Sequence, residues 1–230
     1  MNYIAIIPAR GGSKRLPGKN IREFANLPLI YYSIKYALNC SKISNVYVST
    51  DSDEIAQISE KYGAKVIYRP EELASDTATT TSVLEHAIRE IQSYEIELDG
   101  IITLQATNPL RTNELIEEGL CLFENHYNDL DSVVSVSLNH YKLGEIQNDL
   151  FVPTLYSREQ RSQDLKKYYY ENGLLYITKP SVILNQKSIF GERVKPLIHN
   201  SIFSSIDIDT VDDFQLAEMI FEKYKSIFNY

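Results

Sequence analysis

Cysteine is scarce in this sequence of 230 residues, which contains only Cys40 and Cys121. Neither has a metal-ligand neighbour at the spacing of a zinc motif, so a zinc site is not expected. Both lie in stretches that we predict to be helical. We therefore interpret them as reduced, packed thiols.

Long hydrophobic runs are also missing. None approaches the about 20 apolar residues of a membrane span, and the apolar run near the N-terminus is short and followed at once by charges, unlike a signal peptide. We expect no membrane association and a cytoplasmic location. Repeats, low-complexity tracts and Gly/Ser linkers are absent as well, which predicts a single domain over residues 1–230.

An excess of positive charge is lacking, because the formal net charge is −8. Nucleic acid is therefore not an expected partner. The cations are nevertheless unevenly spread, and five of them crowd the first 22 residues: Arg10, Lys14, Arg15, Lys19 and Arg22. This cluster predicts a local anion site within an acidic protein.

Short apolar runs alternate with amphipathic stretches along the chain. The runs at 3–8, 45–50, 100–104 and 132–136 predict strands, and helices are predicted to begin at Pro28, after Ser52, at Thr112 or Asn113, and after Thr210. This alternation indicates an α/β fold with a mostly parallel sheet and helices on both faces. Ligands bind at the carboxyl ends of such strands, which places the loops 9–20, 50–53, 105–111 and 137–142 on one side.

The segment from about 139 to 170 breaks this rhythm. It is polar and has no strong helical or strand period. A structureless loop of this length is uncommon inside a compact domain. We interpret it as an arm that lies on a second subunit or covers a site.

The loop after the first strand, PARGGSKRLPGKN, combines three glycines with four cations. Glycines allow close backbone approach, and successive N–H groups can form an anion-binding concavity. The side chains of Arg10, Lys14, Arg15 and Lys19 suit a triphosphate. A Walker loop is excluded because five residues separate Gly12 from Gly18 and no Ser or Thr follows Lys19. The alternative interpretation is a solvated basic turn.

Several motifs in order resemble the CMP-sialic acid synthetase family. The pattern A-R-x-G-S-K-x-x-P-x-K-N at residues 9–20 is its opening. The resemblance continues through Val48–Asp51, Arg69–Thr77, Leu104–Thr112, Ser132–Val136, Gln160–Tyr176 and Ser205–Thr210, and covers nearly the whole chain.

The resemblance implies a three-layer α/β/α, Rossmann-like nucleotidyltransferase fold, Mg²⁺ dependence, and a homodimer whose projecting arm reaches the partner's site. It implies that CMP is transferred from CTP to a nine-carbon acidic sugar. The nucleotide-binding residues would be Arg10, Gly11, Gly12, Ser13, Asn20, Arg69, Ala78 and Thr80, with Arg10, Lys14, Lys19 and Asp209 catalytic. The sugar would meet Gln105, Lys142, Arg161, Tyr176 and Phe190, with Arg161 on its carboxylate.

Asp207 and Asp209 match the metal-binding pair of that family. In a strand, residues two apart point to the same face, so both carboxylates would meet one ion. Mg²⁺ favours one or two carboxylates together with phosphate oxygens and water. Asp209 is also a candidate for accepting the proton of the sugar hydroxyl. The alternative interpretation is that the pair only introduces the following helix.

Departures from the family pattern concern the sugar. The chain has Leu138–Lys142 (LNHYK) where these enzymes carry an E-H-H-P-like turn, Tyr170-Glu171 where Arg-Pro is common, and Ala106 in place of a proline. Legionaminate or pseudaminate therefore fits as well as N-acetylneuraminate. The alternatives are an enzyme for an eight-carbon octulosonate, a nucleotidyltransferase that transfers another nucleotide to a sugar phosphate, and a non-catalytic nucleotide-binding homologue.

Overall fold

The computed structural model describes residues 1–93 and 97–228, which form a seven-stranded sheet in the order β11-β7-β10-β6-β1-β4-β5. The strands are β1 (Tyr3–Pro8), β4 (Ile43–Thr50), β5 (Lys65–Tyr68), β6 (Gly100–Thr103), β7 (Ser132–Leu138), β10 (Tyr169–Thr178) and β11 (Val194–Ile198). Strand β10 runs antiparallel to its two neighbours, and the other neighbouring pairs are parallel. The mostly parallel sheet predicted from the alternating pattern is confirmed.

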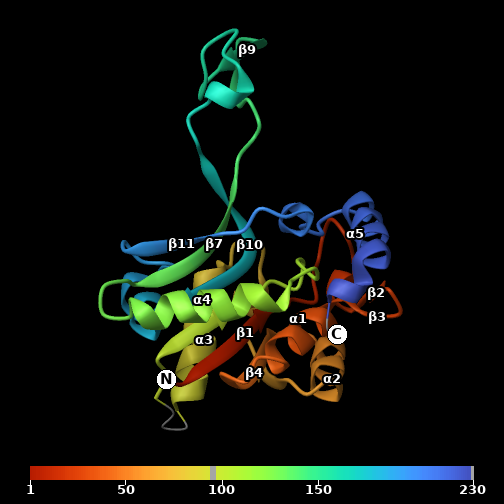
Figure 1. The fold of residues 1–230 in the computed structure, drawn as a ribbon. Coiled ribbons are helices and arrows are strands. Elements are labelled where there is room, and N and C mark those ends of the chain that lie inside the picture. Colours follow the sequence, from red (N-terminus) through yellow and green to blue (C-terminus); the bar gives the residue numbers. More distant parts are fainter. Residues whose placement is uncertain (94–96, 229–230) are drawn as a thin grey trace.

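Helices cover both faces of this sheet (Figure 1). They are α1 (Leu29–Leu38), α2 (Asp53–Lys61), α3 (Thr80–Gln92), α4 (Asn113–Asn125) and α5 (Val211–Tyr224). Alternate residues of a strand point to opposite faces. Accordingly, Tyr3, Ala5 and Ile7 share a core with α1, α2 and α4, whereas Ile4 and Ile6 pack with α3. The fold is the predicted three-layer α/β/α arrangement.

Helix α5 packs on a third apolar cluster rather than on the sheet. The ring of Phe24 lies edge-on to the rings of Tyr32 and Phe214, at centroid distances of 5.1 and 5.6 Å. Phe24 belongs to a small ribbon of β2 (Glu23–Phe24) and β3 (Leu27–Pro28). A capping box formed by Thr210 and Asp213 starts the helix as predicted. This packing fixes the segment that enters α5.

Parallel strands bring the predicted loops together. Strands β1, β4 and β6 run side by side in the same direction and end at Pro8, Thr50 and Thr103. Strands β6 and β7 are both antiparallel to β10, which lies between them, so β7 points in the same direction as β6. The carboxyl ends therefore meet at one edge, which lies uppermost in Figure 1 and which we call the carboxyl edge.

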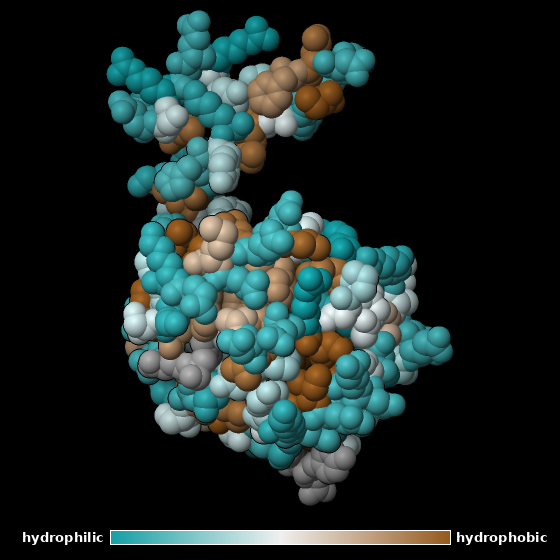
Figure 2. All heavy atoms as spheres, turned by 90° about the vertical axis from the view of Figure 1, so that its right-hand side faces the viewer, coloured by the Kyte–Doolittle hydropathy of each residue, from teal (hydrophilic) through white to brown (hydrophobic). Residues whose placement is uncertain are grey.

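The segment between β7 and β10 forms an arm that projects from this edge (Figure 1). It is not structureless: β8 (Gly144–Gln147) and β9 (Leu150–Pro153) pair as a hairpin, followed by the short helix η3 (Ser162–Asp164). The space-filling view shows the arm standing clear of the body, with apolar side chains near its tip (Figure 2). Ile146, Leu150 and Phe151 of the hairpin are exposed.

The remaining helices are single turns: η1 (Lys19–Ile21), η2 (Glu71–Ala74), η4 (Val182–Gln186), η5 (Ile202–Ser205) and η6 (Lys225–Ile227). Two local predictions are wrong. Cys40 lies after the end of α1, and Cys121, although helical, is exposed rather than packed. Within the described ranges no helix is long and apolar enough to cross a membrane.

Candidate functional site

The loop after β1 is held in place by backbone contacts. The amide of Ala9 donates to Ser49 O at 2.9 Å, the amide of Gly11 donates to Asp51 Oδ1 at 3.0 Å, and the Asn20 side chain donates to Arg10 O at 3.0 Å. Gly18 has a φ of 67°, which favours glycine. The Gly11 amide therefore already has a partner and does not point freely into the predicted concavity of N–H groups.

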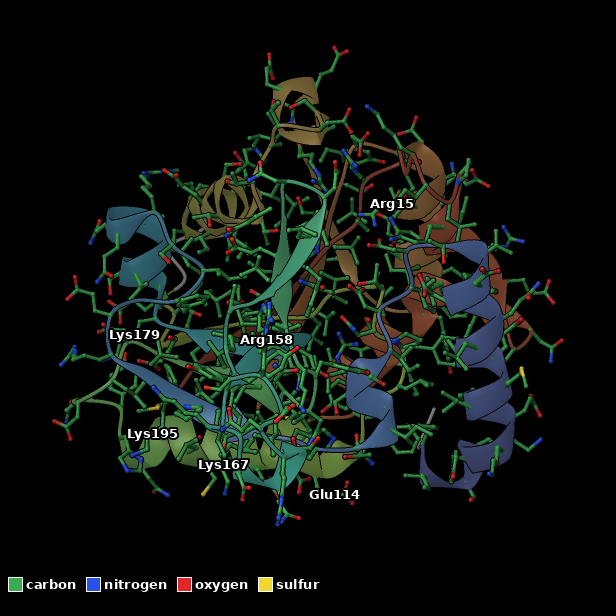
Figure 3. The ribbon with its side chains drawn as sticks, turned by 90° about the horizontal axis from the view of Figure 1, so that it is seen from above. Arg15, Glu114, Arg158, Lys167, Lys179 and Lys195 are labelled. Carbon is green, nitrogen blue, oxygen red and sulfur yellow. The ribbon has the colours of Figure 1, made fainter. Side chains whose placement is uncertain are left out.

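A cavity of about 200 Å³, here called the loop cavity, opens beside this loop. Its lining includes Arg10, Ser13, Lys14, Arg15, Lys19, Asn20, Thr107 and Asp209. The Asp209 carboxylate receives the Lys19 ammonium on Oδ1 and the Arg15 guanidinium on Oδ2, each at 2.9 Å. Seen from above the carboxyl edge, Arg15 lies on the side of the molecule that carries α5, far from Lys179 and Lys195 (Figure 3).

A second carboxylate holds the other two loop cations. Asp76 accepts from Arg10 Nη1 at 2.9 Å and forms an ion pair with Lys14. Hydrogen bonds from Lys14 and Arg10 hold the pKa of Asp76 below its usual value. Four cations that suit an anion are thus paired with two carboxylates, Asp76 and Asp209. An incoming polyanion must displace these carboxylates or bring its own cation.

A cavity of about 230 Å³, here called the Arg69 cavity, adjoins the loop cavity, and both are lined by Pro8 and Arg10. Arg69 is 8% exposed and donates to Ser49 O at 2.6 Å and to Leu73 O at 3.2 Å. Among the described residues its Nε has no partner. Ala78 and Thr80 also line this cavity, where Thr79 caps α3 by accepting from the Ser82 amide.

A larger cavity of about 500 Å³, here called the Gln105 cavity, lies on the other side of the loop cavity. It is lined by Gln105, Tyr141, Tyr170, Glu171, Asn172, Gly173, Tyr176, Ser204, Ser205 and Asp207. Asp207 lies two residues from Asp209, and Gln105 two residues from Thr107. Since Asp209 and Thr107 line the loop cavity, the two cavities are neighbours along these two segments.

A bulge in β10 shapes this cavity. The pairing of β10 with β7 shifts register between Glu171 and Tyr176. Within the bulge, the buried Asn172 bonds to both Ser135 and Ser137 of β7. Gly173 adopts a φ of 73°, and a Cβ there would lie 3.1 Å from Gln105 Oε1. A side chain at position 173 would therefore strain the backbone and would require the Gln105 side chain to move by a few tenths of an ångström.

The side chain of Arg111 joins the two walls of the Gln105 cavity from beneath. It is 1% exposed. Its guanidinium donates to Leu174 O at 2.6 Å, to Gln105 O at 2.7 Å and to Asn108 O. One buried cation therefore ties the loop after β6 to β10. Sequence reasoning missed this role, because nothing in the order of residues shows that Arg111 points inward.

The phenol of Tyr176 donates to Glu171 Oε2 at 3.1 Å. Burial is the main reason that the pKa of Tyr176 is raised well above its usual value, and the negative charges of Glu171 and Asp207 add to the shift. The hydroxyl therefore stays protonated and keeps donating to Glu171 over the whole physiological pH range.

Asp207 and Asp209 do not lie in a strand, so that part of the prediction is wrong. Residues 206–209 are irregular and are tied to the loop after β6, since Ile208 N donates to Thr107 O at 2.9 Å and Asn108 donates to Ile206 O at 2.6 Å. Ile208, which lies between the two aspartates in the sequence, is buried. The carboxylates line different cavities, with Asp207 in the Gln105 cavity and Asp209 in the loop cavity.

Three of the predicted sugar-binding residues line none of these cavities. Lys142 donates to Gln160 O within the arm, and Arg161 is an exposed arm residue that begins η3. Phe190 lies at the sheet edge opposite to the cavities. Its neighbour Ile189 is held there, because the Ile189 carbonyl accepts a hydrogen bond from Thr178 at the end of β10. Tyr141, Tyr170, Glu171 and Asp76 were missed as lining residues, although Tyr170-Glu171 had stood out as a departure from the family pattern.

A cytidylyltransferase family model matches residues 4–227. The chain is 39% identical to the CMP-N,N'-diacetyllegionaminic acid synthase of Legionella pneumophila over 96% of this chain and 97% of that protein. It is 34% identical to the pseudaminic acid cytidylyltransferase of Campylobacter jejuni, with the same coverage.

Among solved structures, CMP:2-keto-3-deoxy-manno-octonic acid synthetase complexed with CTP is similar in fold, with a TM-score of 0.73 and 19% identity. The similarity covers 97% of this chain and 99% of that one. At this level of identity the likeness supports the nucleotidyltransferase fold alone.

Proposed function

This chain belongs to the cytidylyltransferase family, and from that premise we propose that it transfers CMP from CTP to the C2 hydroxyl of a nine-carbon acidic sugar. The observation that carries the proposal is the order of the three adjoining cavities along the carboxyl edge. The Arg69 cavity suits a base, the cation-lined loop cavity suits a triphosphate, and the Gln105 cavity suits a polyhydroxylated acceptor. The names of the two relatives support the choice of a nine-carbon acid.

In this proposal the nucleotide spans two cavities. The cytosine lies against Arg69, Ala78 and Thr80, and the phosphates lie along the glycine-rich loop with Arg10, Ser13, Lys14 and Lys19. Fixed cations stabilise charge as it develops on the leaving pyrophosphate, without reorganising at the moment of reaction.

The donor set also fits a magnesium ion. Asp209 would offer a carboxylate in the loop cavity, beside the phosphates, and Asp207 would offer one from the adjoining Gln105 cavity. Mg²⁺ is bound in this way in many nucleotide sites, with substrate phosphates and water completing its shell. When bound, it supplies charge neutralisation of the phosphates and lowers the pKa of a coordinated hydroxyl.

The reaction is an in-line displacement. The sugar lies in the Gln105 cavity with its C2 hydroxyl facing the loop cavity, past Thr107 and Asp209. The bond from the C2 oxygen to the α-phosphorus forms, and the bond from the α-phosphorus to the bridging oxygen of pyrophosphate breaks. The hydroxyl proton passes to the Asp209 carboxylate, which lines the loop cavity. Arg10, Lys14 and Lys19 hold the departing pyrophosphate.

The arm supports a homodimer in this proposal. The arm stands clear of the body (Figure 2), Arg161 begins η3 on it, and Lys142 donates to Gln160 O within it, so a partner's site is where the two charges would meet a sugar carboxylate. Sedimentation at the mass of one chain, 26.4 kDa, would contradict the dimer. The cytoplasmic location stays a prediction.

Replacing Asp76 by asparagine is expected to tighten CTP binding by a factor of about two to five, within the range of exposed ion pairs. The substitution frees Arg10 and Lys14 from a competing carboxylate and removes a negative charge beside the triphosphate. Calorimetric titration of the variant with CTP measures the change. Glu72→Gln, an exposed neighbour outside the three cavities, is the matched control. Weaker CTP binding in Asp76→Asn would show that Asp76 contacts the nucleotide.

The proposed function is tested by Mg²⁺-dependent pyrophosphate release from CTP. The acceptor panel contains neuraminate, legionaminate, pseudaminate and octulosonate acids. We expect release with at least one nine-carbon acid and a CMP-sugar product of matching mass. Release with the octulosonate alone would favour the eight-carbon alternative. Bound CTP without release from any acid would favour a non-catalytic homologue or another acceptor.

A further inference from the structure

The end of the Gln105 cavity that lies at the base of the arm has an unusual combination of chemistry. Its lining residues there are Tyr141, Tyr170 and Glu171. Within the described ranges, the residues lining the whole cavity include the carboxylates of Glu171 and Asp207 but no lysine or arginine. A cavity of this kind offers acceptors to a ligand's donor groups and repels a ligand carboxylate.

The Glu171 carboxylate is held so that one oxygen remains available. Oε2 receives the phenol of Tyr176 at 3.1 Å, and that phenol stays protonated. Among residues 1–93 and 97–228, Oε1 has no hydrogen-bond or ion-pair partner, and Glu171 itself is exposed to the cavity. The orientation is fixed by the bulge, because Glu171 directly precedes the anchored Asn172.

An apolar hollow of about 410 Å³ continues from this end of the cavity, and Tyr141 and Tyr170 line both. Its other lining residues are Asn139, Leu143, Leu155, Tyr168 and Tyr169. A charged acceptor therefore lies at the margin of a surface made of tyrosine rings and leucines. An N-acetyl group matches this pair of features, since it presents an N–H donor and an apolar methyl group that are separated only by the carbonyl carbon. A hydroxyl group offers a hydrogen-bond donor to the carboxylate but no apolar group to the hollow.

The reacting end of the cavity is the opposite one. Asp207 lies next to the loop cavity through Ile208 and Asp209, whereas Tyr141 and Tyr170 lie where the arm leaves the body. A sugar acid whose C2 hydroxyl faces the phosphates must extend its carbon tail toward the arm. The substituents on that tail are the ones that reach Glu171.

We propose that Glu171 and the ring of Tyr170 form a subsite that selects nine-carbon acids carrying an acylamido group on the tail, with Glu171 accepting the amide N–H. This inference rests on the proposed function and specifies its substrate. The Glu171 carboxylate also orients the substrate. It repels the carboxylate of the sugar acid and so disfavours the reversed orientation, in which the sugar carboxylate would point toward the arm.

Steady-state pyrophosphate release with two acceptors tests the subsite. One acid carries acetamido groups at C5 and C7, and the other, N-acetylneuraminate, carries a hydroxyl at C7. We expect the wild-type chain to favour the first in kcat/KM. In Glu171→Gln this preference falls about 10- to 100-fold, as for loss of a hydrogen bond to a charged group. Tyr170→Ala lowers the same preference, and the KM for CTP is unchanged in both.

Glu192→Gln is the matched control, because Glu192 is an exposed carboxylate beside β11 on the sheet edge opposite to the cavities. It should leave both acids unaffected. Equal losses for the two acids in Glu171→Gln, or a wild-type preference for the C7 hydroxyl, would overturn the subsite and leave the proposed function intact. Bound CTP with no turnover of either acid would reject both.

Discussion

Asp209→Asn is expected to lower kcat about 10³-fold while CTP still binds. A metal-bound site contributes several kcal/mol to phosphoryl transfer, and about 4 kcal/mol corresponds to this loss at about 1.36 kcal/mol per tenfold. Asparagine keeps the size of the side chain but weakens the ligand. It also loses the charge that now pairs with Lys19 and Arg15. Single-turnover kinetics over a range of Mg²⁺ concentrations measure the effect.

Asp212→Asn is the control for this substitution. Asp212 lies three residues further along, exposed in the first turn of α5, and lines none of the three cavities. The control variant should retain turnover, whereas Asp209→Asn should need more Mg²⁺ for whatever turnover remains. Near-normal kcat in Asp209→Asn at ordinary Mg²⁺ would exclude Asp209 as a metal ligand.

Arg111→Met is expected to destabilise the fold by about 3–5 kcal/mol, because several buried carbonyl oxygens lose their donor at once. The acceptors are Gln105 O, Asn108 O and Leu174 O, and the side chain is 1% exposed. For a chain of this size the midpoint of thermal unfolding should fall by about 6–20 °C. Calorimetry without ligands measures the shift.

The matched control is Arg89→Met, at a position on the surface of α3. Among the described residues, Arg89 forms an ion pair with Glu85 alone, one helical turn away, an exposed arrangement worth less than about 1 kcal/mol. Its unfolding midpoint should change by a few degrees at most. If Arg111→Met unfolds at the wild-type temperature, water has replaced the guanidinium, and Arg111 does not hold the two walls of the Gln105 cavity together.

Local patterns predicted much of this protein from the sequence. The buried runs at 3–8 and 100–104 became β1 and β6, Ser52 and Thr210 cap the helices that they were expected to start, and the loops after the strands share one edge. These features depend on neighbours within a few residues, on the period of apolar side chains and on the direction of parallel strands. The prediction of an anion site at the cation-rich loop depends on the same kind of local pattern.

Contacts between distant segments were beyond such reasoning. Lys14 meets Asp76, and Tyr141 and Tyr170 line the same hollow at the base of the arm, only because strands separated in sequence lie side by side. Phe190 was assigned to the sugar, but the antiparallel course of β10 carries it to the opposite edge.

The sequence by itself thus determined the chemical class of the site, since the type and spacing of residues 9–20 and 205–210 are local properties. Only the tertiary structure decided how that chemistry is distributed. The irregular path of residues 206–209, tied to the loop after β6, sends Asp207 and Asp209 into different cavities. The bulge at Gly173 and the buried Arg111 set the shape of the Gln105 cavity. Packing across long sequence distances controls such positions, and no local pattern encodes it.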